Sequence, residues 1–315
     1  MKKALLSLIF GAFAVAAYAQ EQAIYNQYQV FPILVNPGYT GFEDEHQFLG
    51  NARSTWTGFP GKPTNFSAMY HGPVGDKLAL GGGLFSEKIG DVTTMKLQFN
   101  YAFRFRVQKA KIGIGLSTEF LNRHADSGLL SNQLVDPNDD ILEGLTDGQQ
   151  IFDASVGAHM LYDERFFMSI SLPNTVRARL DDVPIENQSQ QASLLEFYIF
   201  QVGYIVHLKD QNFKLVPSIA FRQIRDTPFQ VDANLQGRFL DDKLITGLTY
   251  RPSNNGSVAF LIGTKYKVFQ LCYSYDVSFS KFQQYNGGSH ELTVAFNLPR
   301  KTPKPVGTNT SDLYQ

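Results

Sequence analysis

Ser289 and His290 are the residues of this sequence that most directly suggest catalysis. A serine hydroxyl next to a histidine base is the core of a nucleophilic hydrolytic set. No Gly-x-Ser-x-Gly elbow accompanies the pair, and the six histidines are scattered along the chain. We therefore expect ordinary structural histidines, assign no catalytic residue and expect no enzyme.

An acidic run and a glycine run are the other candidates. Asp136-Pro137-Asn138-Asp139-Asp140 groups the oxygen ligands that calcium prefers, but it lacks the internal glycine and closing glutamate of a helix-loop-helix site. A solvated turn begun by Asp136-Pro137 is the better interpretation. The run Gly81-Gly82-Gly83 is not followed by the Lys-Ser/Thr of a phosphate loop, so these glycines more plausibly let a strand bend or another segment press close. We expect no metal ion and no cofactor.

The composition favours a β protein without intrachain disulfide bonds. The 315 residues include 26 Phe, 15 Tyr and 26 Gly, and only 18% are charged. The net charge of −1 argues against a nucleic-acid partner, which would require a basic excess. Cys272 is the only cysteine of this sequence, so it cannot form an intrachain disulfide, and stability must come from strand pairing.

The first residues predict export. Lys2 and Lys3 precede an apolar run from Ala4 to Ala17, and Ala17-Tyr18-Ala19 offers small residues where a signal peptidase reads. We expect a signal peptide at 1–19, because the apolar run is shorter than the ~20 residues of a spanning helix. Gln20, not cysteine, would follow the cleavage site, so no lipid anchor is expected there. No later stretch is long and apolar enough for a helix in the inner membrane.

Alternating apolar and polar residues predict strands with two different faces. In the clearest segment, seven large apolar residues share one face and polar or charged residues share the other. The apolar face comprises Met95, Leu97, Phe99, Tyr101, Phe103, Phe105 and Val107. About fourteen such segments begin near 46, 63, 78, 94, 111, 151, 165, 194, 212, 229, 243, 257, 268 and 289.

The parity of the connections predicts a membrane barrel. Connections after even-numbered strands are short, whereas those after odd-numbered strands are longer, with two much longer loops at ~123–150 and ~173–193. An even strand count with this asymmetry is typical of a transmembrane antiparallel up-and-down β-barrel in an outer membrane. We expect the barrel at 46–298, outer-membrane lipid around it, both termini in the periplasm and a disordered periplasmic tail at 299–315.

Eight charged residues would face the lumen in this register. They could line a weakly selective pore, or they could form a lattice of ion pairs that fills and stiffens the barrel. The sequence does not separate these alternatives. The residues are Lys96, Arg104, Arg106, Lys111, Glu119, Asp232, Arg238 and Lys265.

The segment 20–45 before the first strand is not strand-like. It contains Gln27-Tyr28, then Asn36-Pro37-Gly38-Tyr39-Thr40-Gly41, with turn-forming residues packed closely. It could be a plug that enters the lumen from the periplasm, or a docking strap for a partner.

These motifs resemble the PorP/SprF family of Bacteroidetes outer-membrane proteins over essentially the whole mature chain. The leading Gln-Tyr and Asn-Pro-Gly-Tyr-Thr-Gly elements carry the resemblance, together with Arg53-Ser54-Thr55-Trp56-Thr57-Gly58-Phe59-Pro60-Gly61-Lys62-Pro63-Thr64. The long acidic loop at ~123–150, between the fifth and sixth predicted strands, also matches the family. So do Lys88-Ile89-Gly90-Asp91 and Asn100-Tyr101-Ala102-Phe103-Arg104. Gly38 and Thr40 stand where alanines are frequent, a mild departure.

The resemblance implies a non-enzymatic barrel that works with the type IX secretion system and gliding motility. It would help a specific cargo, such as a large adhesin, to be secreted or held at the cell surface. The loops at 123–150 and 173–193 would then face the cargo, and segment 20–45 and the tail would face periplasmic or peptidoglycan-associated partners. No residue is assigned to partner binding. The alternative is an outer-membrane channel for small or hydrophobic solutes with an N-terminal plug.

Overall fold

The computed structural model describes residues 25–126, 140–176, 178–180, 197–208, 212–223, 229–252 and 256–300. The expected signal peptide, residues 20–24, the tail beyond Arg300 and most of the acidic run lie outside the described residues. Most of the loop at 173–193 does too.

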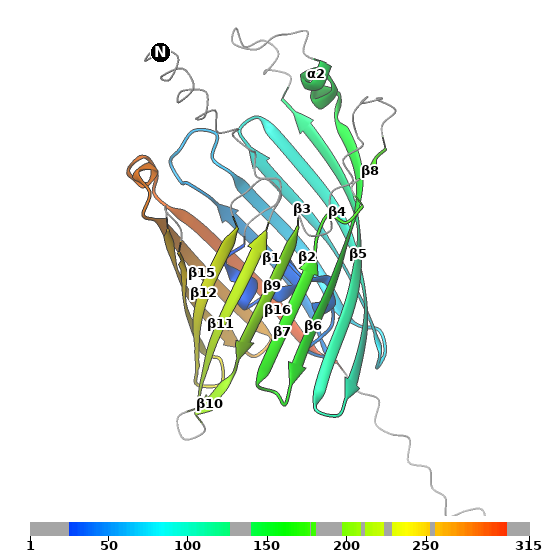
Figure 1. Ribbon diagram of the computed structural model, residues 1–315, viewed down its shortest axis with the longest axis vertical. Coiled ribbons are helices and arrows are strands. Elements are labelled where there is room, and N and C mark those ends of the chain that lie inside the picture. Colours follow the sequence, from blue (N-terminus) through cyan, green and yellow to red (C-terminus); the bar gives the residue numbers. More distant parts are fainter. Residues whose placement is uncertain are drawn as a thin grey trace, which may run out of the picture.

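The described strands form a closed antiparallel barrel, with β16 hydrogen-bonded to β1 and β9 to both β7 and β11 (Figure 1). The barrel has fourteen strands, because β9 and β10 occupy one position in the wall and β8 pairs only with β6. This confirms the predicted fold class. The bounds are β1 Glu45–Ser54, β2 Thr64–Pro73, β3 Leu78–Ile89, β4 Val92–Val107, β5 Ala110–Ala125, β6 Gln149–Tyr162, β7 Phe166–Leu172, β8 Ala178–Arg179, β9 Tyr198–Tyr204, β10 Val206–Leu208, β11 Phe213–Gln223, β12 Gln230–Phe239, β13 Leu244–Arg251, β14 Ser257–Tyr266, β15 Phe269–Ser278 and β16 Ser289–Pro299.

Each strand separates an apolar outer face from a mostly polar inner face. On β4, Tyr101 and Phe103 are exposed, whereas the alternate residues Asn100 and Arg104 are buried. This period of two follows from the pleat, which sends successive side chains to opposite faces. Among the described residues, no helix is long and apolar enough to cross a membrane.

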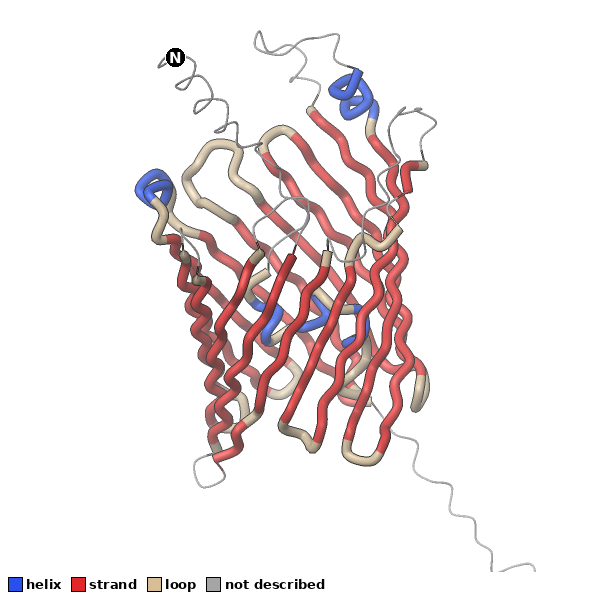
Figure 2. Tube along the Cα trace, viewed as in Figure 1, coloured by secondary structure: helices blue, strands red, loops and turns tan. Residues whose placement is uncertain are grey.

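The two ends of the barrel differ in their connections (Figure 2). At the turn end, short turns contain left-handed residues such as Asp163 and Glu164, whose φ angles are 50° and 56°. Two consecutive positive φ angles match the hairpin turn that suits the twist of paired strands. The opposite loop end carries α2 (Asp140–Asp147) and η6 (Lys281–Tyr285).

A proline explains one interruption of strand pairing in the wall. The pairing of β9 with β11 ends at Gly203 and Ser218, and the pairing of β10 with β11 begins at Val206 and Leu215. Pro217 lies in the gap between them. Proline has no backbone N–H to donate to a neighbouring strand, so a ladder weakens there. The eighth wall position is therefore divided into β9 and β10.

Residues 25–44, hereafter the plug, lie inside the barrel (Figure 2). The plug folds as three short turns, η1 (Gln27–Gln29), η2 (Pro32–Leu34) and η3 (Pro37–Tyr39). Prolines begin η2 and η3, where a missing N–H is harmless. The plug crosses the lumen, because η1 bonds to β12, β15 and β16 whereas η3 packs against β5 and β6 on another side of the wall (Figure 2). It begins at Asn26 near the loop end and ends at Asp44, which directly precedes β1 at the turn end.

The centre of the lumen is apolar. Val30, Phe31, Ile33 and Leu34 of the plug pack against inward-facing wall residues. The sequence analysis placed only polar and charged residues on this inner face. An apolar side chain that points inward breaks the alternating pattern, so the pattern cannot identify it. The wall residues are Leu49, Met69, Ile245, Leu261, Cys272 and Ala295.

Candidate functional site

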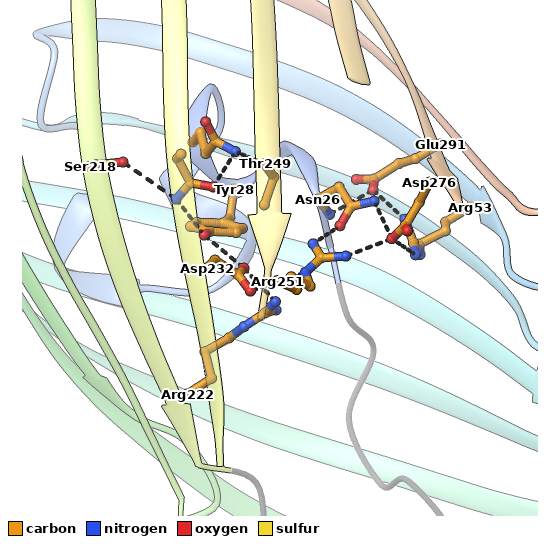
Figure 3. A network of polar contacts seen from close by, with 12 residues as sticks. Asn26, Tyr28, Arg53, Ser218, Arg222, Asp232, Thr249, Arg251, Asp276 and Glu291 are labelled. Atoms are coloured by element: carbon orange, nitrogen blue, oxygen red, sulfur yellow. Dashed lines mark hydrogen bonds and ion pairs between the residues drawn. The ribbon is translucent and has the colours of Figure 1, made fainter. Parts of the chain in front are cut away.

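The interface between the plug and the wall is the most elaborate polar arrangement of the described residues. Near the loop end, the Asn26 backbone N–H donates to Glu291 Oε2 over 2.8 Å, and its side-chain amide donates to Asp276 Oδ2 over 3.0 Å. Arg251 donates to the Asn26 side-chain oxygen, to Asp276 over 2.6 Å and to Asp232 over 3.0 Å. Asn26 is thereby held by β13, β15 and β16 (Figure 3).

Tyr28 extends this network along the wall to the neighbouring strands β11 and β12. Its hydroxyl donates to Asp232 Oδ2 over 3.0 Å and accepts from Asn234 over 2.9 Å. Arg222 donates to the same Asp232 oxygen over 2.6 Å and lies over the Tyr28 ring. Gln29 donates to Asn234 and Thr249. One plug turn therefore connects several wall strands through buried and partly buried groups.

The charges of this network balance. Arg53, Arg222 and Arg251 contact Asp232, Asp276 and Glu291 in a continuous series of buried ion pairs. Such a set is tolerated in a low-dielectric interior only when every charge has its partners, and loss of one member leaves the others uncompensated. We refer to these six residues as the charge network. Its structure supports precise positioning of the plug.

Glycines form a cradle for the backbone of η3. A Cβ at Gly113, Gly115 or Gly157 would collide with Gly38, Pro37 or Asn36. In the other direction, a Cβ at Gly38 would lie 2.8 Å from the Gly157 carbonyl oxygen and the Ala158 Cα. The wall therefore accepts the plug backbone at van der Waals contact because side chains are missing on both sides.

Asn36 fixes the plug in this cradle. Its amide donates to the Ala158 and Ile170 carbonyls over 2.9 and 3.1 Å and to Ser169 Oγ over 2.6 Å. Its side-chain oxygen accepts from the Gly38 N–H over 2.7 Å, which caps η3. The Asn-Pro-Gly motif of the sequence thus combines a cap, a proline start and a close approach.

A second set of charges holds the plug at the turn end. Arg104 donates to the Gly41 carbonyl, to Asp44 over 2.6 Å and to the Gly75 carbonyl over 3.0 Å. Lys111 lies 3.5 Å from the other Asp44 oxygen. Partial burial alone would raise the pKa of Asp44, but the Arg104 hydrogen bond and the Lys111 charge outweigh it and lower that pKa.

Most of the predicted inward charges lie on the lumen face and are paired. Arg104 and Lys111 belong to the turn-end set, Asp232 belongs to the charge network, and Lys96 pairs with Glu119 at 3.1 Å. Arg238 lies 3.6 Å from Asp242, and Lys265 lies 3.8 Å from Glu45. Arg106 is exposed at the turn end. In the described region the charges therefore form the ion-pair lattice, the second of the two alternatives.

The sequence analysis named Arg53 only as part of the stretch that carries the family resemblance, and it did not single out Arg222, Arg251, Asp276 or Glu291. Alternation puts the carboxylates on polar faces, but contacts such as Asn26 with Glu291 span 265 positions in the chain. No local spacing indicates a pairing of that range. The Gln27-Tyr28 motif was the available signal that the segment before β1 has specific partners.

Ser289 and His290 are not a hydrolytic pair. As neighbours in β16 they point to opposite faces. Ser289 is buried and its Oγ lies 3.3 Å from the Trp56 N–H, whereas the His290 ring contacts the Tyr273 hydroxyl on the outer face. The glycine run 81–83 lies within β3, where Gly81 and Gly83 pack closely against β2. That packing is consistent with the second role expected for these glycines.

Solved structures with the same fold are outer-membrane barrels. The CymD monoaromatic hydrocarbon channel is 11% identical, with 90% of this chain and 95% of that chain covered and a TM-score of 0.50. The Pseudomonas putida toluene transporter TodX is 9% identical, covers 85% and 93%, and has a TM-score of 0.46. Acinetobacter baumannii Omp33 is 7% identical, covers 82% and 99%, and has a TM-score of 0.45. At these identities the likeness shows the fold alone.

A search of curated proteins found no match. The family model for the type IX secretion system membrane protein PorP/SprF matches residues 17–296, which include the plug and almost the whole barrel. The closed β-barrel and the match to a membrane-protein family agree with an outer-membrane location. This chain belongs to the PorP/SprF family of type IX secretion system membrane proteins.

Proposed function

We propose that this protein is a non-enzymatic platform in the outer membrane that helps one specific type IX cargo, such as a large adhesin, to be secreted or held at the surface. Family membership supports the secretion context. The observation that carries the platform role is the plug, which forms part of the hydrophobic core of the barrel.

The packing argues against a plug that leaves the lumen. Its departure would expose Leu49, Met69, Ile245 and Leu261 to water, and burial of each such side chain contributes ~1.5–3 kcal/mol. It would also remove Asn26 and Tyr28 from the charge network. A plug that moves during function would repeatedly expose the wall residues beneath it to water. Here those wall residues are apolar at the centre of the lumen. A rigid, filled barrel suits attachment better than conduction.

We propose that the turn end faces the periplasm and the loop end faces outward, as in barrels with short periplasmic turns. Arg300 then lies on the periplasmic side, where the tail would meet periplasmic or peptidoglycan-associated partners. The outer loops would face the cargo. In this orientation Asn26 lies near the outer end of the lumen, which does not favour the expected periplasmic N-terminus. Surface labelling of an N-terminal tag on intact cells tests that expectation, and labelling would overturn it.

Deletion of the gene, followed by quantitative mass spectrometry of surface and medium proteins, tests the platform role. We expect one large surface protein to be released or not secreted, while other type IX cargo is unchanged. Complementation with the wild-type gene restores that protein, and deletion of residues 181–190 in the outer loop reproduces the loss without loss of the barrel. An unchanged protein profile would contradict the proposal.

One feature favours the channel alternative. At the Pro217 interruption, a cavity of about 480 Å³ opens on the outer wall between β9 and β13. It is lined by apolar side chains that include Ile219, Leu235 and Leu248. A hydrophobic solute could enter the barrel wall there. Uptake of small aromatic solutes by cells with and without the gene tests this role, and reduced uptake in the deletion strain would support it.

A further inference from the structure

Three neighbouring connections at the loop end are joined by their backbones. Thr57, in the β1–β2 loop, donates its N–H to Gly288 O over 2.8 Å and accepts from the Gly287 N–H over 2.7 Å. Gly61 of the same loop accepts from the Gly90 N–H between β3 and β4 over 3.0 Å. These bonds turn separate loops into one fixed structure, so side chains on it have defined positions.

Aromatic side chains gather on this structure. The Phe282 ring meets the rings of Trp56 and Phe59 edge to face, with centroid distances of 5.3 and 5.0 Å. Phe279 and Tyr285 are 63% and 66% exposed. We call these five residues the aromatic rim. In Figure 1 the loop that carries η6 (orange, upper left) leans away from the barrel axis.

Trp56 has an unusual backbone. Its φ of 53° lies in the left-handed region, which bulky residues rarely adopt and which persists only where the surroundings hold it. Its own N–H faces Ser289 Oγ, and its carbonyl accepts from the Phe59 N–H. The chain therefore keeps its only tryptophan in a fixed, partly exposed position at the outer edge of the wall.

Beneath the rim, the lipid-facing apolar run of β16 is shorter than that of β4. On β4 apolar side chains continue from Met95 to Val107, which spans ~30 Å of membrane at the usual strand rise and tilt. On β16 the corresponding run from Leu292 to Leu298 spans only ~15 Å, whereas an outer-membrane belt is ~25 Å tall. About 10 Å of apolar height is missing on β16, whereas the outward run of β15 from Phe269 to Val277 spans ~20 Å.

The missing height cannot be supplied at the turn end. Lys267 lies in the turn that follows β14, and Arg300, just past β16, binds the Gly75 carbonyl and Asp76. These charges exclude a deeper position of the barrel on this side. Above the belt, Tyr273 and Tyr275 lead directly to the aromatic rim, so the apolar surface continues at the loop end.

We propose that the aromatic rim is a lipid-binding surface that lies in the outer leaflet, at the boundary between acyl chains and head groups. Trp and Tyr favour this boundary because one side of the ring system is apolar and the other can hydrogen-bond. The rim completes the belt over β15 and β16 and sets the depth of the barrel. This assignment is independent of the cargo role.

The single tryptophan allows a direct test with the full-length wild-type protein in lipid vesicles. We expect Trp56 emission to be quenched by lipids brominated near the head group more strongly than by lipids brominated at the end of the acyl chain. We expect weak quenching by aqueous acrylamide. Trp56 would then lie at the interface and not in water.

Two matched variants calibrate the depth scale, both in a Trp56→Phe background. Tyr101→Trp places the probe at the centre of the β4 belt, and Lys109→Trp places it in an exposed turn. Quenching of Trp56 like that of the turn probe would overturn the proposal and indicate a water-exposed surface for a protein partner. Quenching like that of the belt-centre probe would also overturn it, because the rim would then lie in the acyl core.

Discussion

At the scale of single residues, contacts in the lumen depend both on glycines, which lack a side chain, and on paired charges. Gly115 and Gly38 allow two backbones to touch, and Asp44 connects the plug to two cations. An added methyl group would disturb the glycine contacts, because the space is already filled. Loss of one charge would disturb the ion pairs, because they are partly shielded from water.

A methyl group in the cradle should loosen the plug. Gly115→Ala would place its Cβ against the Pro37 carbonyl, and backbone cannot give way as a flexible side chain does. We expect a loss of ~1–3 kcal/mol in the free energy of unfolding, the usual cost of overpacking. Denaturant titration followed by circular dichroism measures it. Gly50→Ala is the control, since a Cβ there meets nothing within 4 Å, and equal losses in both variants would contradict the cradle.

Acid should weaken the turn-end contact of the plug. The folded pKa of Asp44 lies below its unfolded value, so its ion pairs stabilise fully above the unfolded value of ~4 and are lost as pH falls through the folded pKa. We expect the protection factor of the Gly41 N–H, which corrects the exchange rate for the slower intrinsic exchange in acid, to fall at low pH. Asp44→Asn should show that lower protection already at neutral pH.

The control for this measurement is Asp163→Asn, which removes an exposed pair with Lys109 at 3.0 Å and should leave Gly41 unchanged. Protection at Gly41 that is insensitive to both pH and Asp44→Asn would show that Asp44 does not hold the plug.

At the scale of elements, the strands were predictable, whereas the plug was expected only as one of two alternatives for segment 20–45 and its partners were not. The predicted segments near 46, 78, 111 and 289 begin within two residues of β1, β3, β5 and β16, because each strand has lipid on one face and a polar lumen on the other. The plug has no periodicity, and its partners lie far away in the chain. The fold class followed from local pattern, whereas the candidate site depends on long-range contacts that no pattern encodes.

Two smaller elements show the same limit. Pro217 falls in a segment with otherwise good alternation, so the division into β9 and β10 was not expected. The short β8 continues the line of β7 along β6 after a break, and two residues carry too little pattern to be recognised.

Cys272 provides a natural reporter for the seating of the plug. It is the only cysteine of this sequence, is completely buried and packs in the core that the plug completes. We expect no maleimide labelling of the folded protein and clear labelling of Phe31→Ala, in which the plug loses its largest apolar contact with the wall. Mass spectrometry of the intact protein measures the modification.

The control for labelling is Lys267→Cys in a Cys272→Ala background, which puts the thiol in an exposed turn and should react at once. Rapid labelling of Cys272 in the unchanged protein would show that the plug leaves its seat spontaneously.

At the scale of the whole molecule, the plug and the barrel behave as one folding unit. The barrel alone would enclose an apolar patch and an incomplete charge network. This integration distinguishes the molecule from a pore that contains a separate gate, and it makes a prediction about conduction.

Removal of the plug should not produce an open pore. We expect the wild-type protein to carry no steady current in planar bilayers, and a variant that lacks residues 25–40 to unfold and not to conduct. Gel mobility before and after heating reports whether the barrel is intact. A folded, conducting deletion variant would instead support the channel alternative.

The charge network also has a consequence for assembly. Arg53 lies in the first strand, Asp276 and Glu291 lie in the last two, and Asn26 precedes them all. During synthesis and insertion, an unfinished chain therefore carries arginines and carboxylates that have no counterpart yet. Neutrality inside the lumen is reached only when the final strand arrives, so truncated chains remain electrically mismatched and open to degradation. Completion of the chain and stability of the product are coupled by the same few side chains.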